Sequence, residues 1–225
     1  MVLEVKIAVP ENVYLKDPQQ SKLGLQLIQE GIELIEEIGF EAFTFKKLAT
    51  KINSTEASVY RYFENKQQFL QFLFSWYWGW MNYKIHMETA SLTTANEKLI
   101  RSIKLLTQSN DVVDSITTPH EAKLKSIINQ EGIKAVLNKN VDQVNQTGAF
   151  ENYKQLVEKM TCWIHEINPT FNYPQMLLTT IIEGAHLQHF FATHLPRLTN
   201  QSSENNAVEL FYIQLICTQI TTNNG

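Results

Sequence analysis

The sequence has few of the residues that break or staple a chain. Eight glycines and six prolines among 225 residues exclude a collagen-like or linker-like protein and disfavour a turn-rich all-β fold. The two cysteines, Cys162 and Cys217, are too few for a disulfide scaffold or a four-cysteine zinc site. The chain must therefore be held together by an ordinary apolar core, for which it is long enough.

A large excess of charge and a long apolar run are missing as well. The chain has 19 basic and 23 acidic residues, a net charge of −4, so we do not expect it to coat nucleic acid or a membrane by bulk charge. The most apolar run, residues 69–81, contains Gln71 and is too short to span a bilayer. Glu4 and Lys6 interrupt the stretch that a signal peptide would keep apolar. We expect no membrane association and a cytoplasmic location.

Helical periodicity dominates from Ser21 onward. Apolar residues recur at intervals of three and four, with a stop at Gly39 and polar breaks at 108–119, 138–149, 168–173 and 199–206. The pattern predicts helices from residue 21 to Gly39 and over 44–52, 56–63, 66–89, 96–107, 120–137, 151–167, 174–195 and 204–221. We therefore predict an all-α protein.

Residues 1–20 stand apart from this pattern. Val5, Ile7 and Val9 alternate with Lys6 and Ala8, which is compatible with a short strand. The alternative is an arm that becomes ordered only on contact with a partner.

The segment from Thr44 to Lys66 has the pattern of a helix-turn-helix. Thr44 and Thr55 stand where helix N-caps are expected, and Asn53 and Ser54 separate the two short helices. The segment holds five basic and two acidic residues in a chain that is acidic overall. Positive charge is thus concentrated where DNA phosphates would be contacted.

Here the chain resembles the TetR family of transcriptional regulators. The resemblance rests on GFEAFTFKKLA at residues 39–49 and on ASVYRYFENKQQFL at residues 57–70, and it covers about residues 21–81. It implies a three-helix DNA-binding domain over 21–66, extending to about residue 81, after an arm over 1–20. Residues 67–225 would form a helical domain for ligand sensing and dimerisation.

The resemblance also implies roles for individual residues. Thr44, Tyr60, Tyr62 and Lys66 match phosphate contacts, and Val59 and Phe63 match packing positions. Glu56, Ala57 and Arg61 match the positions of the recognition helix that face the major groove. The complete set expected at double-stranded DNA is Thr44, Lys46, Lys47, Thr55, Glu56, Ala57, Ser58, Tyr60, Arg61, Tyr62 and Lys66.

Three departures from the family pattern leave a second interpretation open. Asn53 and Ser54 stand in place of the usual turn glycine and the apolar residue after it, Glu56 stands in place of a frequent cation, and only Lys16 and Lys22 remain of a basic arm. The alternative is a protein of this fold that binds DNA weakly or not at all and acts through protein partners.

The C-terminal half offers candidates for an effector site. Residues 60–83 hold 11 of the 24 aromatic residues, and an apolar or aromatic small molecule would suit such surroundings. The residues we associate with such a ligand are Trp76, Trp80, Met81, Trp163 and His186. The competing interpretation is that the aromatic residues are simply core.

Neither a metal site nor a catalytic site is predicted. His186 and His189, like Cys162 and His165, are spaced by three residues, but the sequence places no third ligand beside either pair. Cys162 and His165 could act as nucleophile and base of a small enzyme, yet no glycine-rich elbow or orienting acid lies near them. We predict no cofactor and no enzymatic activity.

The last two predicted helices carry apolar stripes. One contains Met176, Thr180, Gly184, Leu187 and Phe191, and the other contains Val208, Phe211, Tyr212, Leu215 and Gln219. In the family these helices meet their copies in a homodimer, which reads two half-sites about 34 Å apart. The sequence thus predicts a ligand-responsive homodimeric regulator, a repressor by resemblance, on a pseudo-palindromic operator.

Overall fold

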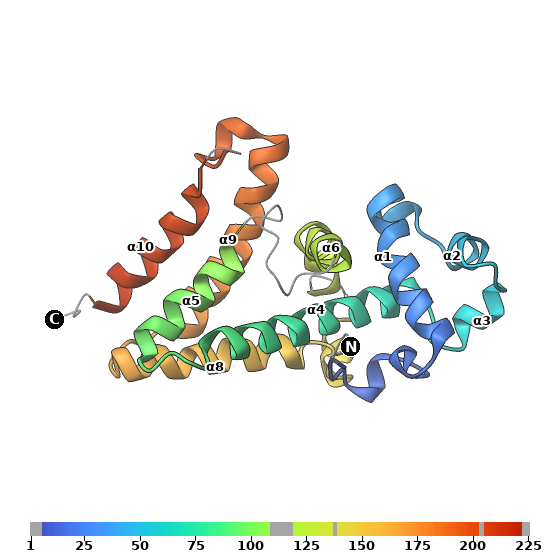
Figure 1. Ribbon diagram of the computed structural model, residues 1–225, viewed down its shortest axis with the longest axis horizontal. Coiled ribbons are helices and arrows are strands. Elements are labelled where there is room, and N and C mark those ends of the chain that lie inside the picture. Colours follow the sequence, from blue (N-terminus) through green and yellow to red (C-terminus); the bar gives the residue numbers. More distant parts are fainter. Residues whose placement is uncertain (1–5, 109–118, 137–138, 203–204, 222–225) are drawn as a thin grey trace. The chain divides into compact units, whose positions relative to one another are not determined.

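The chain is all-α, as the sequence predicts. The computed structural model describes residues 6–108, 119–136, 139–202 and 205–221. These residues form ten α-helices and three short 3-10 helices and contain no strand (Figure 1). None of the helices in this described part has the length and apolar character needed to cross a bilayer.

The helices fall into two compact units. One unit comprises Met1–Trp80 with Val113–Tyr153, and the other comprises Met81–Val112 with Lys154–Gly225. This division follows compactness and not function. The functional division into residues 1–20, 21–66 and 67–225 therefore stays a prediction.

The first unit contains the predicted helix-turn-helix. Its elements in chain order are η1 (Glu11–Val13), η2 (Pro18–Gln20), α1 (Lys22–Ala42), α2 (Phe45–Lys51), α3 (Glu56–Tyr60), the first part of α4 (Lys66–Thr89), α6 (Pro119–Val136) and α7 (Val141–Gln146). The sequence treats residues 138–149 as a polar break, whereas α7 forms within them. A helix of six residues is too short to show a convincing period.

Gly39 interrupts α1 where the sequence places a stop. Its backbone has φ 75° and ψ 157°, outside the helical region, and one further turn follows as far as Ala42. This combination of angles is open almost only to glycine. The break turns the chain toward Thr44, which begins the next helix.

Phenylalanine rings form the core of this unit. Phe43 and Phe69 stack with ring centroids 5.6 Å apart, and Phe63 meets Phe69 edge to face at 5.0 Å. The Phe69 ring also lies over Gly31, where an added Cβ would come within 2.5 Å of it. Val59 and Phe63 are completely buried, which confirms their predicted packing roles.

Residues 6–20, which we call the N-terminal strap, form neither a strand nor a free arm. Ile7, Val9 and Val13 are buried, and the only regular structure in the strap is η1 and η2. The strand expected over residues 5–9 is absent from the described residues 6–9 because their backbone is bonded to side chains and not to a second strand.

The second unit is built from the other helices. They are the last part of α4, α5 (Ala95–Thr107), most of α8 (Glu151–Ile167), α9 (Pro174–His194), η3 (Pro196–Leu198) and α10 (Ala207–Thr221). Helices α9 and α10 approach closely at Gly184, where an added Cβ would come within 2.1 Å of the Tyr212 hydroxyl. Gly184 and Tyr212, which the sequence assigns to the dimer stripes, therefore lie inside one chain's own helix pair.

Candidate nucleic-acid interface

The turn between α2 and α3 is closed by a Schellman motif. Asn53 has a positive φ of 52°, the Ser54 N–H donates to the Ala49 carbonyl at 2.9 Å, and the Asn53 N–H donates to the Thr50 carbonyl at 3.2 Å. Glycine is common at such a position, and asparagine is the next most tolerant residue. The replacement of the family's turn glycine by Asn53 therefore leaves the motif intact.

Threonine side chains begin both helices of the motif. Thr44 Oγ1 accepts from the Lys47 N–H at the start of α2, and Thr55 Oγ1 accepts from the Ser58 N–H at the start of α3, both at 3.3 Å. These caps satisfy one N–H of each first turn and leave others directed outward, where they can meet an anion.

Most of the predicted DNA-binding residues are accessible. Glu56, Ser58 and Lys66 are partly exposed, and the exposed members of the set are Thr44, Lys46, Lys47, Thr55, Ala57, Tyr60 and Arg61. They lie on α2, α3 and the residues directly flanking them. Only Tyr62 is buried, with 3% of its surface exposed.

The cations of this surface differ in how they are held. Lys47 Nζ donates to the Ala42 carbonyl at 2.9 Å, and Lys66 Nζ donates to the Phe40 and Glu41 carbonyls at 3.1 and 3.0 Å. Both lysines thus close the end of α1. The side chains of Lys46 and Arg61 have no hydrogen-bond or ion-pair partner among the described residues, so they are free to reach phosphate or base.

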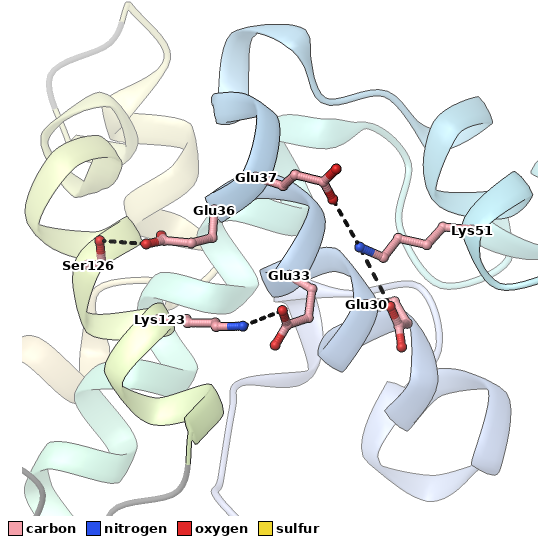
Figure 2. A network of polar contacts seen from close by, with 7 residues as sticks. All are labelled: Glu30, Glu33, Glu36, Glu37, Lys51, Lys123 and Ser126. Carbon is pink, nitrogen blue, oxygen red and sulfur yellow. Dashed lines mark hydrogen bonds and ion pairs between the residues drawn. The ribbon is translucent and has the colours of Figure 1, made fainter.

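The positive charge of Lys51 is opposed by α1. Figure 2 shows its ammonium group between two carboxylates, with Nζ 3.3 Å from Glu37 Oε2 and 3.8 Å from Glu30 Oε2. The sequence counts Lys51 among five cations available to DNA. That charge count covered only residues 44–66, so it left out Glu30 and Glu37, which lie on α1.

The same helix carries contacts to α6. Glu33 pairs with Lys123, Ser126 Oγ donates to Glu36 Oε1 at 3.3 Å (Figure 2), and Lys134 Nζ lies 2.9 Å from Glu41 Oε1. Glutamates on this side of α1 thus join it to both α2 and α6.

Tyr60 is presented at the outer edge of the motif. Its ring meets Phe45 of α2 edge to face at 5.2 Å, and 47% of the residue is exposed. Partial burial, followed by the nearby Glu56 carboxylate, raises the pKa of the Tyr60 hydroxyl. The hydroxyl thus remains a neutral donor for a phosphate oxygen at physiological pH.

Tyr62 is held inside the protein. Its hydroxyl lies 2.8 Å from Ser21 Oγ, its carbonyl accepts from the Leu15 N–H at 2.8 Å, and Lys16 Nζ lies 5.2 Å from its ring centroid. Since the hydroxyl has a partner within the chain, the geometry favours a supporting role for Tyr62. Its predicted phosphate contact would require this hydrogen bond to open or to be shared.

The five residues predicted to bind an effector belong to different units. Trp76 and Trp80 are partly exposed in the first unit. Met81 and His186 are buried and Trp163 is partly exposed in the second unit. Two surface hollows of about 700 and 520 Å³, at the start of α1 and between the start of α4 and α7, include none of them. The effector site stays a prediction.

Metal-ligating residues are dispersed. Within the described ranges, no three His, Cys, Asp or Glu side chains are grouped as a metal ion would need. His189 Nε2 lies 2.7 Å from the Thr107 carbonyl, and His186 Nδ1 lies 3.9 Å from Glu183 Oε2. The two histidines thus have partners within the protein.

Three solved structures share this architecture. The fatty acid degradation regulator FadR from Bacillus halodurans is 16% identical, with a TM-score of 0.56 over 85% of this chain and 92% of that one. The superantigen PfiT is 15% identical, with a TM-score of 0.59 over 92% and 100%. AibR in complex with isovaleryl coenzyme A and operator DNA is 12% identical, with a TM-score of 0.56 over 84% and 95%.

At these identities the likeness establishes the fold alone, and a comparison with curated protein sequences gives no match. The helix-turn-helix region is more specific: residues 27–72 match the family model described as bacterial regulatory proteins, tetR family. Residues 27–72 therefore resemble the DNA-binding region of tetR-family regulators, and the chain as a whole shares the fold of the three solved structures.

Proposed function

We propose that the protein is a ligand-responsive repressor that binds a pseudo-palindromic operator as a homodimer in the cytoplasm. The observation that carries the proposal is the exposed surface of α2 and α3, where Lys46 lies in the first turn of α2 and Tyr60 and Arg61 lie at the end of α3. A surface of this kind offers phosphate contacts and a short helix that can enter a major groove.

The residues at α3 have separate tasks in this proposal. Arg61 can donate two hydrogen bonds to the O6 and N7 of a guanine, and Glu56 can accept from a cytosine amino group. The small side chain of Ala57 allows the helix to approach the bases closely. Thr44, Lys46, Lys47, Thr55, Ser58, Tyr60 and Lys66 would contact the flanking phosphates.

The homodimer is supported by apolar residues that the monomer leaves exposed on α9 and α10. On α9, Met176 and Leu187 are 68% and 49% exposed, and Phe190 is exposed as well. On α10, Leu210 and Phe211 are 64% and 57% exposed. Five large apolar side chains on two adjacent helices are typical of an interface. A second copy is the occupant we propose, because two half-sites multiply the affinity of a weakly charged reader.

For the effector we propose an apolar or aromatic small molecule that binds near Trp76, Trp80, Met81, Trp163 and His186. Two structures of similar fold, a fatty acid degradation regulator and a complex with isovaleryl coenzyme A and operator DNA, support an effector with an apolar part. For a near-complete switch, the effector must favour the DNA-free state by about 5.5 kcal/mol.

Selection of bound sequences from random duplex DNA tests this function. We expect enrichment of a two-fold symmetric sequence whose half-site centres are about 10 base pairs, one helical turn, apart. Absence of any enriched sequence would favour the second candidate, a helical sensor that acts through protein partners. That candidate is favoured by the two glutamates that oppose Lys51 and by the acidic Glu56 at the start of α3.

A further inference from the structure

The N-terminal strap joins two distant parts of the first unit. Its first residues lie against the middle of α4 and the turn between α7 and α8, and its last residues lie against Tyr62, directly after the recognition helix α3. All of these contacts are within one compact unit.

We call the contact region at α4 and α8 the first seat and the contact region at Tyr62 the second seat. The side-chain amide of Asn152 connects the parts of the first seat. Asn152 Nδ2 donates to the Ala8 carbonyl at 2.9 Å and to the Ser75 carbonyl at 2.9 Å, and it lies 3.4 Å from Ser75 Oγ. Asn152 thereby holds the strap and α4 together. The replacement of Asn152 by alanine would remove every one of these donors.

Two glycines provide space for this seat. A Cβ added at Gly79 would come within 2.5 Å of Ile7 Cγ2, so the Ile7 side chain lies directly on the α4 backbone. A Cβ added at Gly148 would come within 3.1 Å of the Pro10 ring. Side chains at these two positions would push the strap away from the body of the unit.

The second seat surrounds Tyr62. Three successive parts of the chain hold this residue: the backbone N–H of Leu15 bonds its carbonyl, the ammonium of Lys16 faces its ring, and Ser21 Oγ bonds its hydroxyl. Tyr62 follows Arg61, the C-cap of α3, and its own N–H donates to the Val59 carbonyl. A displacement of Tyr62 would therefore also displace the end of the recognition helix.

Contacts within the strap make it a fixed spacer between the seats. The Gln19 side-chain amide bonds both backbone groups of Ile7, at 2.8 and 3.3 Å, and Lys6 Nζ lies 3.1 Å from Asp17 Oδ2. Because hydrogen bonds join Ile7 to Gln19, a displacement of Ile7 is transmitted along the strap and is not taken up by a flexible segment.

We propose that the strap is a positioning element for DNA recognition, with Asn152, Leu15 and Tyr62 as its positioning residues. It sets the orientation of α3 from a seat at the first turn of α8, and it contacts no DNA through these residues. This inference rests on the proposed DNA-binding function, and it adds a dependence of that function on a side chain about 90 residues beyond the recognition helix.

The test compares Asn152→Ala with Glu158→Ala, an exposed position on the same helix. The probe is the duplex that the unaltered protein selects from random DNA. We expect Asn152→Ala to bind it about 5-fold or more weakly, with an unchanged slope of log K against log salt, because no phosphate contact is lost. Glu158→Ala should bind as the unaltered protein does.

Hydrogen exchange gives a readout that does not depend on DNA. In Asn152→Ala we expect faster exchange at the Leu15 and Phe63 amides, with protection in α9 unchanged. Gly79→Ala should reproduce both effects, because the added Cβ would come within 2.5 Å of Ile7 Cγ2 and within 2.8 Å of Asn152 Nδ2 and would displace both. Unchanged affinity and unchanged exchange at residues 59–63 would overturn the inference. A shallower salt slope would also overturn it, because that result would indicate direct DNA contact. If the unaltered protein selects no duplex, the proposed function fails, and exchange alone decides the inference.

Discussion

The ammonium group of Lys51 lies 3.3 Å from the nearer carboxylate oxygen of Glu37. A second carboxylate, that of Glu30, lies 3.8 Å away on the other side. The last turn of α2 is thus tied to the acidic side of α1 (Figure 2). Two acidic neighbours reduce the local positive potential, and the lysine would have to leave them to contact a phosphate.

Lysine substitutions on α2 should therefore have unequal effects. Lys46→Ala should lower DNA affinity and reduce the salt slope by about 0.9, the value for one phosphate contact. Lys51→Ala should change the slope by much less, because its charge is already paired. Titrations at several salt concentrations with the selected duplex measure both. Equal slope losses would show that Lys51 leaves its glutamates on binding.

Removal of the acidic partners is the complementary experiment. The double variant Glu30→Gln, Glu37→Gln leaves Lys51 without an ionic partner while keeping the size of both side chains. We expect tighter DNA binding and a salt slope steeper by up to about 0.9, measured on the same duplex. The double variant Glu158→Gln, Glu166→Gln, at two exposed positions of α8, is the control for net charge.

A substitution at Gly39 tests the backbone break that ends the main part of α1. No atom within 4 Å would obstruct a Cβ there, but φ is +75°. Gly39→Ala should therefore lower the free energy of unfolding by about 1–3 kcal/mol through backbone strain alone, measured by urea denaturation. In an ordinary helical conformation the same change would stabilise by up to about 1 kcal/mol, so a stabilised variant would contradict the observed backbone.

Local signals explain why so much of the fold could be predicted. Thr44 and Thr55 each cap the helix that the sequence assigns to them, because a cap depends on residues only two or three positions away. The break at Gly39 is equally local. The helix-turn-helix could be located for the same reason.

Contacts between distant residues explain what the sequence did not predict. The strap is ordered by Asn152, which is 144 residues from Ala8, and no periodicity within residues 6–20 encodes that bond. The pairing of Lys51 with Glu37, and of Glu33 with Lys123, likewise depends on which helix faces which. Charge counted along the chain could not reveal that one of the five cations is opposed by carboxylates.

The Asp17 carboxyl should make the strap sensitive to acid. Burial raises its pKa, but hydrogen bonds from the Gln19 N–H, the Gln20 amide and Lys6 outweigh this, so the pKa lies below its ordinary value of 3.8. A lowered pKa in the folded protein gives stability that is fully present above about pH 4 and is lost as the pH falls through the folded value.

Asp17→Asn should therefore reduce stability near pH 6, and this loss should be smaller near pH 2.5, because the fraction of unaltered protein with a protonated Asp17 carboxyl rises as the pH falls. Urea denaturation at the two pH values measures the difference, and Glu11→Gln in η1 is the matched control. A difference between Asp17→Asn and the unaltered protein that grows toward low pH would contradict this assignment.

The exposed apolar side of α9 should control the oligomeric state. Leu187 is the central member of a stripe that also contains Met176 and Phe190, and a charge at the centre of a buried apolar interface is strongly unfavourable. We therefore expect Leu187→Glu to be monomeric in sedimentation experiments and to bind the selected duplex at least about 100-fold more weakly, because the second half-site is lost. Met87→Glu, at an exposed apolar residue of α4, should remain dimeric. A dimeric Leu187→Glu, or an unaltered protein that is monomeric at micromolar concentration, would mean that this side of α9 has another occupant.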